Sequence, residues 1–435
     1  MLIEFEVGNF LSFRDPVRFS MLAANPIKEH LKENTFEVGR YRLLKSAVIY
    51  GANASGKSNL LEAMAFMRWF VMNSSKAMQV DEDIQVTPFK LDVATENGPS
   101  HFEICFLQND QRYRYGFEAD RKAVRKEWLF RTEKLKEASL FLREDDGIEV
   151  SDDFSEGNGL ESKTRDNALF LSVVAQFNGE IAGTILKWFQ GFRGLYGLRD
   201  QHYERFTTQM LQDEAMRPLL VEFIRRADVG IEDLLVSEAP DDEAMKGGVE
   251  DLQRKATKSK RYKITTVHQK FKNGLKEGFT NLDFTTEESE GTKKFFRIAG
   301  PLLDCLMNGY VVGIDELDAK LHPLLTKAAV RLFNSTDSNQ KNAQLIFTTH
   351  DTNLLHFGHL RRDQIWFTEK TQQAATDLYS LAEIKLPEGG KVRNDAALEK
   401  NYIQGRYGAI PFLGDLGALL KEAGDGSSRQ TERSK

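Results

Sequence analysis

The sequence of 435 residues has only two cysteines, Cys105 and Cys305, each in an apolar stretch without metal-ligand spacing. This pattern predicts two buried free thiols, as in a protein of the reducing cytoplasm. No apolar run reaches the roughly 18 residues that a transmembrane helix needs. The first residues alternate like a strand and lack the basic start of a signal peptide, so we expect a cytoplasmic protein without membrane contact. A net charge of −6 argues against a general DNA-coating protein and leaves local basic patches open.

A short stretch between an apolar strand and a helix, residues 51–58, carries the most specific pattern. It reads Gly-Ala-Asn-Ala-Ser-Gly-Lys-Ser, follows apolar residues 47–50 and leads into a helix-like run over 59–71. In that context the pattern is typical of a phosphate-binding loop, whose backbone N–H groups and helix N-terminus attract anions. Lys57 is expected to reach the β- and γ-phosphate oxygens, and the Ser58 hydroxyl to bind Mg²⁺. The sequence therefore predicts a chain that binds a nucleoside triphosphate.

The first part of the chain alternates in the manner of strands. Residues 1–22 are expected to form a strand pair, and between 83 and 150 apolar residues recur with period 2, as at Phe102, Ile104 and Phe106. This predicts an antiparallel β-meander inserted after the loop helix. The alternating aromatic residues are interpreted as the core of that sheet and not as a platform for stacking bases.

The next part changes to a helical period, and no heptads run through it, which excludes a long coiled coil. A second helical run is expected over 210–227, with a break at Pro218. The positions predicted to share one buried helix face before it are Ile181, Ile185, Phe189 and Phe192.

A basic run without acids follows at 253–276, with two interpretations. Such a run is most often a solvated surface ribbon, and the alternative is a contact with nucleic acid or with an acidic partner. Its members are Arg254, Lys255, Lys258, Lys260, Arg261, Lys263, Lys270, Lys272 and Lys276.

Two apolar strands, 310–314 and 344–347, end in polar residues that could serve ATP hydrolysis. Their continuous apolar character predicts a buried parallel sheet whose ligands gather at the strands' carboxyl ends. Asp315 is expected to hold Mg²⁺ and Glu316 to act as general base toward water. A helix N-cap pair would explain the two acids equally well. His350, after the second strand, is the candidate contact to the γ-phosphate, although a lone histidine at a strand end is most often structural.

Ser289 and Gly291 precede a helix-like run and complete an ordered set of motifs. A Ser-x-Gly at a helix start presents a hydroxyl and backbone N–H groups to an anion, and it also reads as an ordinary N-cap. Phosphate-binding loop, Ser-x-Gly, Asp-Glu and His occur here in the order that defines an ABC-type ATPase.

On these motifs, with residues 9–13, Asp318 and residues 405–411, the chain resembles ABC-type ATPases of the SMC/RecF class. Within that class it resembles the RloA/AriA-like bacterial defence ATPases, relatives of the OLD family. The resemblance implies an α/β fold, namely an ABC-type P-loop ATPase head with an antiparallel β-subdomain and an inserted, mostly helical lobe. We expect the head to comprise 1–177 and 285–422, the lobe to comprise 178–284, and 423–435 to form a disordered tail.

The resemblance also implies roles for individual residues, with ATP and Mg²⁺ as ligands. Glu316 and His350 would be catalytic, and Ser58, Asp315 and Gln176 would bind the metal. The residues expected to contact the nucleotide are Asn53, Ala54, Ser55, Gly56, Lys57, Ser58, Asn59, Gln176, Ser289, Gly291 and Asp318.

Three functions are compatible with these motifs. The first is an ATPase sensor or scaffold in anti-phage defence, acting as a homodimer or larger homo-oligomer on a separately encoded effector, a Toprim-type nuclease or a toxin. No Asp-x-Asp pattern follows a strand after His350, so we expect no Toprim nuclease in this sequence. The second is a RecF-like DNA-repair ATPase. The third, the nucleotide-binding subunit of a transporter, is disfavoured by the long interval between Lys57 and Ser289.

Residues 405–411, Gly-Arg-Tyr-Gly-Ala-Ile-Pro, allow two interpretations. Arg406 and Tyr407 are residue types that often anchor protein interfaces, so the segment could report the nucleotide state to an effector. Alternatively it is a structural turn in which Tyr407 fills the core.

Overall fold

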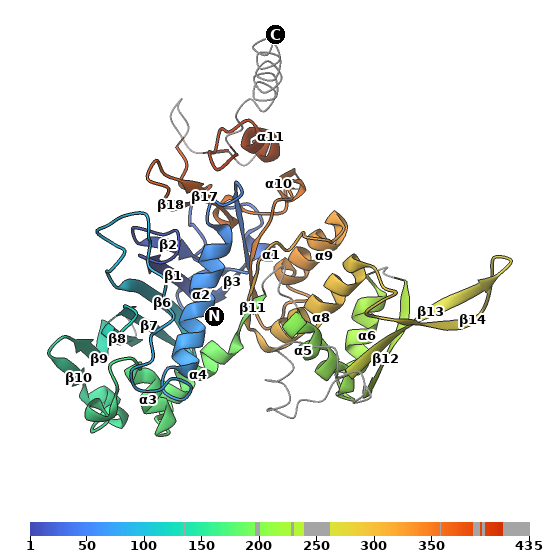
Figure 1. Cartoon of the computed structure of the whole chain (residues 1–435). Helices are drawn as coiled ribbons and strands as arrows, with labels where there is room; N and C mark the ends of the chain where they lie inside the picture. Colours follow the sequence, from blue (N-terminus) through green and yellow to red (C-terminus); the bar gives the residue numbers. More distant parts are fainter. Residues whose placement is uncertain are drawn as a thin grey trace, which may run out of the picture.

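The structure is a computed structural model that describes residues 1–133, 136–195, 201–227, 230–238, 262–356, 358–385, 392–393 and 396–411. Two large sheets and the helices around them form the body of the molecule, from which a long β-hairpin projects (Figure 1). None of the described helices is long and apolar enough to cross a membrane. The predicted tail at 423–435 lies outside the described residues.

A six-stranded sheet forms the centre of the fold. Its neighbouring strands are parallel, except that the last strand runs antiparallel. Ala47 and Ile49 face one hydrophobic cluster while Val48 and Tyr50 face another, so both faces are covered and the apolar runs are continuous. The predicted α/β core is confirmed. In spatial order the strands are β11 (Phe192–Leu195), β15 (Val311–Ile314), β16 (Gln344–Thr348), β5 (Ser46–Gly51), β17 (Ile365–Lys370) and β18 (Thr376–Ser380).

The predicted β-meander is part of a seven-stranded antiparallel sheet. The predicted N-terminal strand pair joins its edge, because β1 pairs with β6 as well as with β2. The sequence pattern predicts the strand pair and the meander separately, but it does not predict that they join in one sheet. The spatial order is β10 (Gly147–Val150), β9 (Lys136–Glu144), β8 (Val124–Glu133), β7 (Gln111–Ala119), β6 (Ser100–Gln108), β1 (Leu2–Gly8) and β2 (Val17–Ser20).

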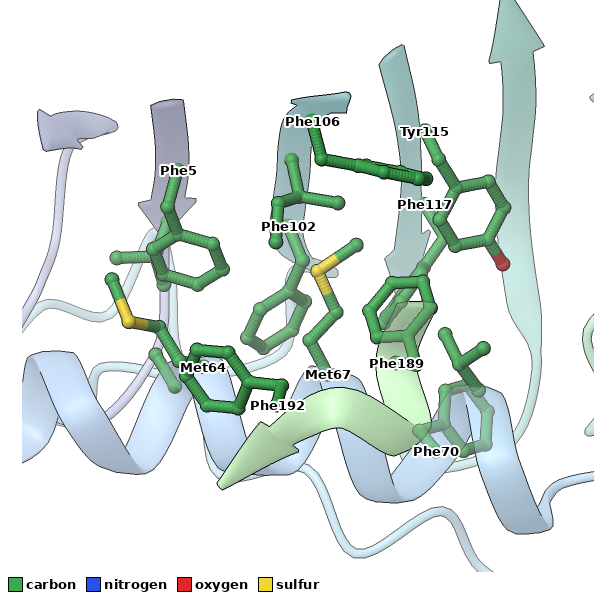
Figure 2. Packing of buried hydrophobic residues seen from close by; sticks show 14 of the residues in the cluster. Phe5, Met64, Met67, Phe70, Phe102, Phe106, Tyr115, Phe117, Phe189 and Phe192 are labelled. Atoms are coloured by element: carbon green, nitrogen blue, oxygen red, sulfur yellow. The ribbon is translucent and has the colours of Figure 1, made fainter. Parts of the chain in front are cut away.

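Helix α2 (Lys57–Asn73) is packed between the two sheets. Figure 2 shows Met64, Met67 and Phe70 of α2 directed at the aromatic residues of the meander, among them Phe102 and Phe117. Both of these phenylalanines are fully buried, which confirms that the alternating aromatics form sheet core. Removing one such ring typically costs about 3–5 kcal/mol of stability, so this contact strongly fixes α2 against the sheet.

The predicted apolar helix face spans two elements. Ile185 and Phe189 are buried on α4 (Glu180–Gly191), which follows α3 (Phe170–Gln176), but Phe192 is not helical. It begins β11 and pairs with Val311 of β15. Placing Phe192 on the helix was therefore wrong. The side chain is buried in either conformation, and periodicity alone does not reveal the change to an extended backbone.

The helical run predicted over 210–227 consists of two helices with different bounds. They are α5 (Gln201–Gln212) and α6 (Arg217–Arg225), and Pro218 opens α6 instead of breaking a longer helix. Proline is tolerated there because the first helical N–H groups have no partner within the helix. The Asp213 carboxylate accepts hydrogen bonds from the N–H groups of Ala215 and Met216 in the turn between the helices.

The same region contains a three-stranded antiparallel sheet that the helical interpretation did not include. Its strands are β12 (Ile231–Glu238), β13 (Tyr262–Lys272) and β14 (Leu275–Asp283), followed by α8 (Glu290–Asn308). The second half of the predicted basic run lies on β13 and β14, and 253–261 lies outside the described residues. The run begins with charged residues and gives way to alternating Ile264, Thr266 and His268, a strand pattern that charge alone obscures.

Short elements complete the fold. The remaining elements are α1 (Leu31–Asn34), β3 (Thr35–Val38), β4 (Tyr41–Leu44), η1 (Asp152–Gly157), η2 (Glu161–Lys163), α9 (Pro323–Asn334), α10 (Asn353–His356), η4 (Arg362–Gln364) and α11 (Leu398–Ile403).

Candidate nucleotide-binding site

The loop between β5 and α2 turns so tightly that one of its glycines has no room for a side chain. Gly56 has φ of 110°, and a Cβ atom built there would lie 2.3 Å from Thr376 Oγ1 and 2.9 Å from Ser12 Oγ. Only glycine combines this backbone conformation with this closeness. The loop therefore leads directly into the N-terminus of α2, whose N–H groups point toward the loop.

Hydroxyl groups from three other segments hold the loop in place. Ser55 Oγ lies 2.6 Å from Thr368 Oγ1 of β17, and Thr376 Oγ1 of β18 donates to the Ser55 carbonyl at 2.7 Å. Ser12 Oγ accepts a hydrogen bond from the Asn59 amide at 2.6 Å and lies 2.7 Å from Thr376 Oγ1. In the sequence, residues 9–13 stand out only as part of a family motif, and both threonines are ordinary strand residues that no motif marks.

Lys57 is buried, with an exposed fraction of 6%, and its ammonium lies over the loop. Nζ donates to the carbonyl oxygens of Gly51 at 2.9 Å and Ala52 at 3.0 Å. Burial lowers the pKa of Lys57, and the carboxylates of Asp315 and Glu316 oppose that shift. A phosphate in the loop would favour the charged ammonium further.

Ser58 and Asp315, two of the three residues predicted to bind Mg²⁺, are in direct contact. Ser58 Oγ donates to Asp315 Oδ1 at 3.1 Å, and Thr348 Oγ1 donates to the same oxygen at 2.6 Å. Thr348 ends β16, which lies between β5 and β15 in the sheet. The carboxyl ends of these parallel strands therefore bring the three side chains together, as predicted for Ser58 and Asp315. The sequence had not identified Thr348. Within the described part of the chain, no group of three or more His, Cys, Asp or Glu side chains is arranged to hold a metal ion.

The backbone of Glu316 is fixed by a hydrogen bond, while its side-chain carboxylate is free to contact a water molecule. Its N–H donates to Thr348 Oγ1 at 2.7 Å, and its φ of 49° is left-handed. A non-glycine residue in this conformation marks a position that surrounding contacts impose. The Glu316 carboxylate makes no hydrogen bond or ion pair to another residue in the described ranges. A general base needs such a free carboxylate.

His350 is exposed and follows β16, and the structure places β16 beside β15, as a contact of His350 with the γ-phosphate needs. Its backbone N–H lies 3.3 and 3.4 Å from the two carboxylate oxygens of Asp318. Asp318 thereby connects the segment after β15 to the segment after β16, next to the loop.

Ser289 is the N-cap of α8, and its hydroxyl accepts a hydrogen bond from Thr292 N–H at 3.1 Å. The start of this helix lies against the segment after β15, because a Cβ on Gly291 would be 2.9 Å from the Lys320 carbonyl oxygen. Ser289 makes no contact with the phosphate-binding loop among the interactions of the described residues.

The acids around Ser289 are all engaged with other groups. Glu290 pairs with Lys320 at 2.9 Å and Lys293 at 3.1 Å, and these two lysines lower the pKa of Glu290 to about 2. The buried Glu288 carboxylate accepts a hydrogen bond from His268 Nε2 at 2.6 Å. Acidic residues beside an anion site would repel phosphate, and these pairings offset that repulsion.

Gln176 is not near the loop. Ser172, one turn earlier on α3, donates its hydroxyl to the carbonyl of Val71 at 2.6 Å, in the last turns of α2. Ser58 lies in the first turn, about 20 Å away at 1.5 Å per residue. Gln176 is therefore not among the predicted site residues that the structure brings to the loop.

The position of α3 is set by Glu127, a buried acid on β8 that lies far from α3 in the sequence. Glu127 accepts hydrogen bonds from the N–H groups of Phe170 and Leu171, at 2.6 and 3.1 Å. That contact holds the start of α3 to the meander, far from the loop.

Residues 405–411 pack against β17, the strand that pairs with the phosphate-binding strand β5. Tyr407 is buried against Phe367 of β17, while Arg406 is exposed. Tyr379 donates its hydroxyl to the Tyr407 carbonyl at 2.8 Å. These contacts favour the structural interpretation of Tyr407, whereas Arg406, Ile410 and Pro411 are exposed.

The loop, the aligned strand ends and the Asp-Glu pair define the class of P-loop ATPases. Residues 46–356 match the family described as "AAA domain, putative AbiEii toxin, Type IV TA system", and the chain belongs to that family. Among solved structures, the SMC head domain from Thermotoga maritima is similar at 14% identity and a TM-score of 0.40, over 87% of this chain and 98% of that one. No curated protein matches the sequence.

The tight turn at Gly56 leads to a testable expectation. Gly56→Ala should weaken ATP binding at least tenfold, because its Cβ would collide with Thr376 and move the loop. Binding is measured by titration with a fluorescent ATP analogue, and folding by thermal melting.

Gly39→Ala is the matched control, since Gly39 has φ of 57° with nothing within 4 Å of a new Cβ. It carries the backbone strain without the collision. Wild-type affinity in Gly56→Ala would contradict the described loop geometry.

Proposed function

We propose that the chain binds and hydrolyses ATP between two copies of itself, and that this reaction controls an effector in bacterial anti-phage defence. The observation that carries the proposal is the contact set of Ser58, Asp315 and Thr348, beside a Glu316 carboxylate without a partner among the described residues. In a P-loop protein this is the position of the metal ligands and of the base that activates water.

The donor set fits Mg²⁺. A hydroxyl and a carboxylate oxygen lie 3.1 Å apart at the end of the loop, and Mg²⁺ is commonly bound by one or two such protein ligands together with phosphate oxygens. When bound there, Mg²⁺ would supply positive charge against the β- and γ-phosphates.

The remaining roles follow from position. The N–H groups at the start of α2 bind phosphate oxygens, and Lys57 exchanges its two carbonyl partners for phosphate. Glu316 accepts the proton of the attacking water. Asp318 holds the backbone of His350 so that its ring can reach the γ-phosphate.

The location of Ser289 supports the proposal of a second copy. This predicted signature residue opens α8 against the segment that includes Lys320 and makes no contact with its own phosphate-binding loop in the described part of the chain. A C2 dimer would place the helix N-terminus of each copy over the loop of the other. The pairing of Glu290 with two lysines supports such an approach to a triphosphate.

The defence role is supported by the family, whose description refers to a toxin and a toxin–antitoxin system. We propose that the effector is a separate protein, a nuclease or a toxin, and that its binding depends on the nucleotide state. Arg406 is exposed beside the buried Tyr407, and as the charged residue of segment 405–411 it is the one through which we expect the effector to bind.

A DNA-repair ATPase is the second candidate. The observation in its favour is the lysine-rich end of the β13–β14 hairpin. An adjacent effector gene and co-purification of its product favour defence, whereas an adjacent recombination gene favours repair.

The role of Glu316 can be tested by removing its charge while keeping its shape. Glu316→Gln should retain ATP affinity and lose about 10²–10⁴-fold in turnover, the usual contribution of a general base. Lys57→Ala should instead lose binding. Phosphate release and ATP titration measure the two effects.

Glu96→Gln is the matched control, because Glu96 is an exposed acid on the loop before β6. It should hydrolyse ATP like the wild type. Hydrolysis by Glu316→Gln at the wild-type rate would show that another group activates the water.

The shared site can be tested by mixing inactive chains. Lys57→Ala and Ser289→Arg chains are each expected to be inactive, but their heterodimer retains one intact site, built from the loop of one chain and the Ser289 of the other. A 1:1 mixture should recover about a quarter of wild-type ATPase if chains exchange randomly within dimers.

Mixing Lys57→Ala with the double variant Lys57→Ala/Ser289→Arg leaves no intact site and serves as control. In parallel, light scattering should give the mass of a dimer for the Glu316→Gln variant with ATP. The double variant Glu316→Gln/Ser289→Arg should give the mass of a monomer. Absence of both effects would mean that the sites are not shared.

A further inference from the structure

The β13–β14 hairpin extends beyond the third strand of its sheet. β12 covers β13 only as far as the pair Ile231 and His268, whereas β13 and β14 continue to the pair Lys272 and Leu275. Residues 269–279 are therefore a two-stranded ribbon, and Figure 1 shows it projecting from the body of the molecule. At about 3.3 Å per residue the ribbon is roughly 15 Å long.

The ribbon exposes large apolar side chains. Phe271, Leu275 and Phe279 have exposed fractions of 58%, 75% and 63%. Pairing with Lys276 and Gln269 places Phe271 and Phe279 on the same face of the ribbon, because paired residues and alternate residues share a face. The two exposed phenylalanines lie along a ribbon that no third strand covers, and exposed apolar residues gathered in this way mark a contact surface.

The same ribbon is basic in a chain of net charge −6. Lys270, Lys272 and Lys276 are exposed, and the one acid among residues 269–279 is Glu277, which pairs with Lys272 at 3.3 Å. Lys270 and Lys276 make no ion pair with any residue that the structure describes. The lysines lie on both faces, since Lys276 shares the face of the two phenylalanines and the other two point to the opposite side.

We propose that residues 269–279 are a docking surface for duplex nucleic acid. A two-stranded ribbon fits the width of the DNA major groove. Lysines on both faces would reach the phosphates on the two sides of the groove, and Phe271 and Phe279 would press against sugars and base edges. The ribbon carries positive charge on both faces around an aromatic pair. This charge complements the backbone of a duplex better than it complements an apolar surface on a partner protein. The inference is independent of the proposed ATPase function.

The test uses the full chain and a fluorescein-labelled 30-base-pair DNA duplex, with anisotropy recorded over a series of salt concentrations. The wild type is expected to bind with an affinity that falls steeply with salt. In the triple variant Lys270→Gln, Lys272→Gln, Lys276→Gln, the slope of log affinity against log salt should fall by about 2–3, at about 0.9 for each phosphate that a lysine no longer neutralises.

A second variant tests the aromatic pair. Phe271→Ser with Phe279→Ser should lower duplex affinity at least tenfold without changing the salt slope, because no charge is removed. The matched control is Lys28→Gln, Lys76→Gln, Lys341→Gln, three exposed lysines elsewhere, which should bind like the wild type. All variants should keep wild-type melting temperature and ATP affinity, so the assay reports the hairpin whether or not ATP is hydrolysed.

Three results would overturn the proposal: no salt-dependent duplex binding by the wild type, unchanged binding by both hairpin variants, or a hairpin-dependent preference for a single strand of the same sequence. If the phenylalanine variant loses a dimer in light scattering and the wild type binds no duplex, the ribbon is instead a contact between copies of the chain.

Discussion

The burial of α2 between the two sheets fixes the helix that begins with Lys57 and Ser58 at the end of the phosphate-binding loop. Met64, Met67 and Phe70 anchor the helix to the aromatic core of the meander, and the opposite side packs against the central sheet. With its axis set, the N-terminus of α2 emerges at the carboxyl ends of the parallel strands. The meander therefore acts as a support for the loop.

Around that fixed helix, short hydrogen bonds between hydroxyl groups and acids connect segments that lie far apart in the sequence. Thr348 joins Asp315 and the backbone of Glu316, while Thr376 joins Ser12 and Ser55. A ligand that shifts the loop or the end of β15 would therefore also displace the strands that are hydrogen-bonded to them. At the other end of the same region, Glu288 joins the start of α8 to His268 at the base of the projecting hairpin. The nucleotide motifs and the hairpin are thus parts of one connected framework.

The sequence predicted the parts of the site that local chemistry determines. The loop, the Asp-Glu pair and the strand ends could be identified because glycine spacing and apolar runs report directly on backbone geometry. Gln176 was misplaced because a short motif does not show that Glu127 holds the start of α3 at the far end of α2. Thr348, Thr368 and Thr376 were missed, since their roles arise only when strands become neighbours. The hairpin was obscured because a basic run does not distinguish strand from loop.

The central proposal is that ATP is held between two chains, and cysteine cross-linking tests it most directly. Cys105 and Cys305 are both buried, and burial raises the pKa of Cys105 to about 12, so added cysteines would be the reactive ones. In a Glu316→Gln background, chains with Asn53→Cys are mixed with chains with Ser289→Cys and treated with a short bis-maleimide. A shared site predicts a cross-linked product of twice the chain mass that forms only in the mixture and only with ATP. A product that forms equally without ATP, or no product in any condition, would contradict it.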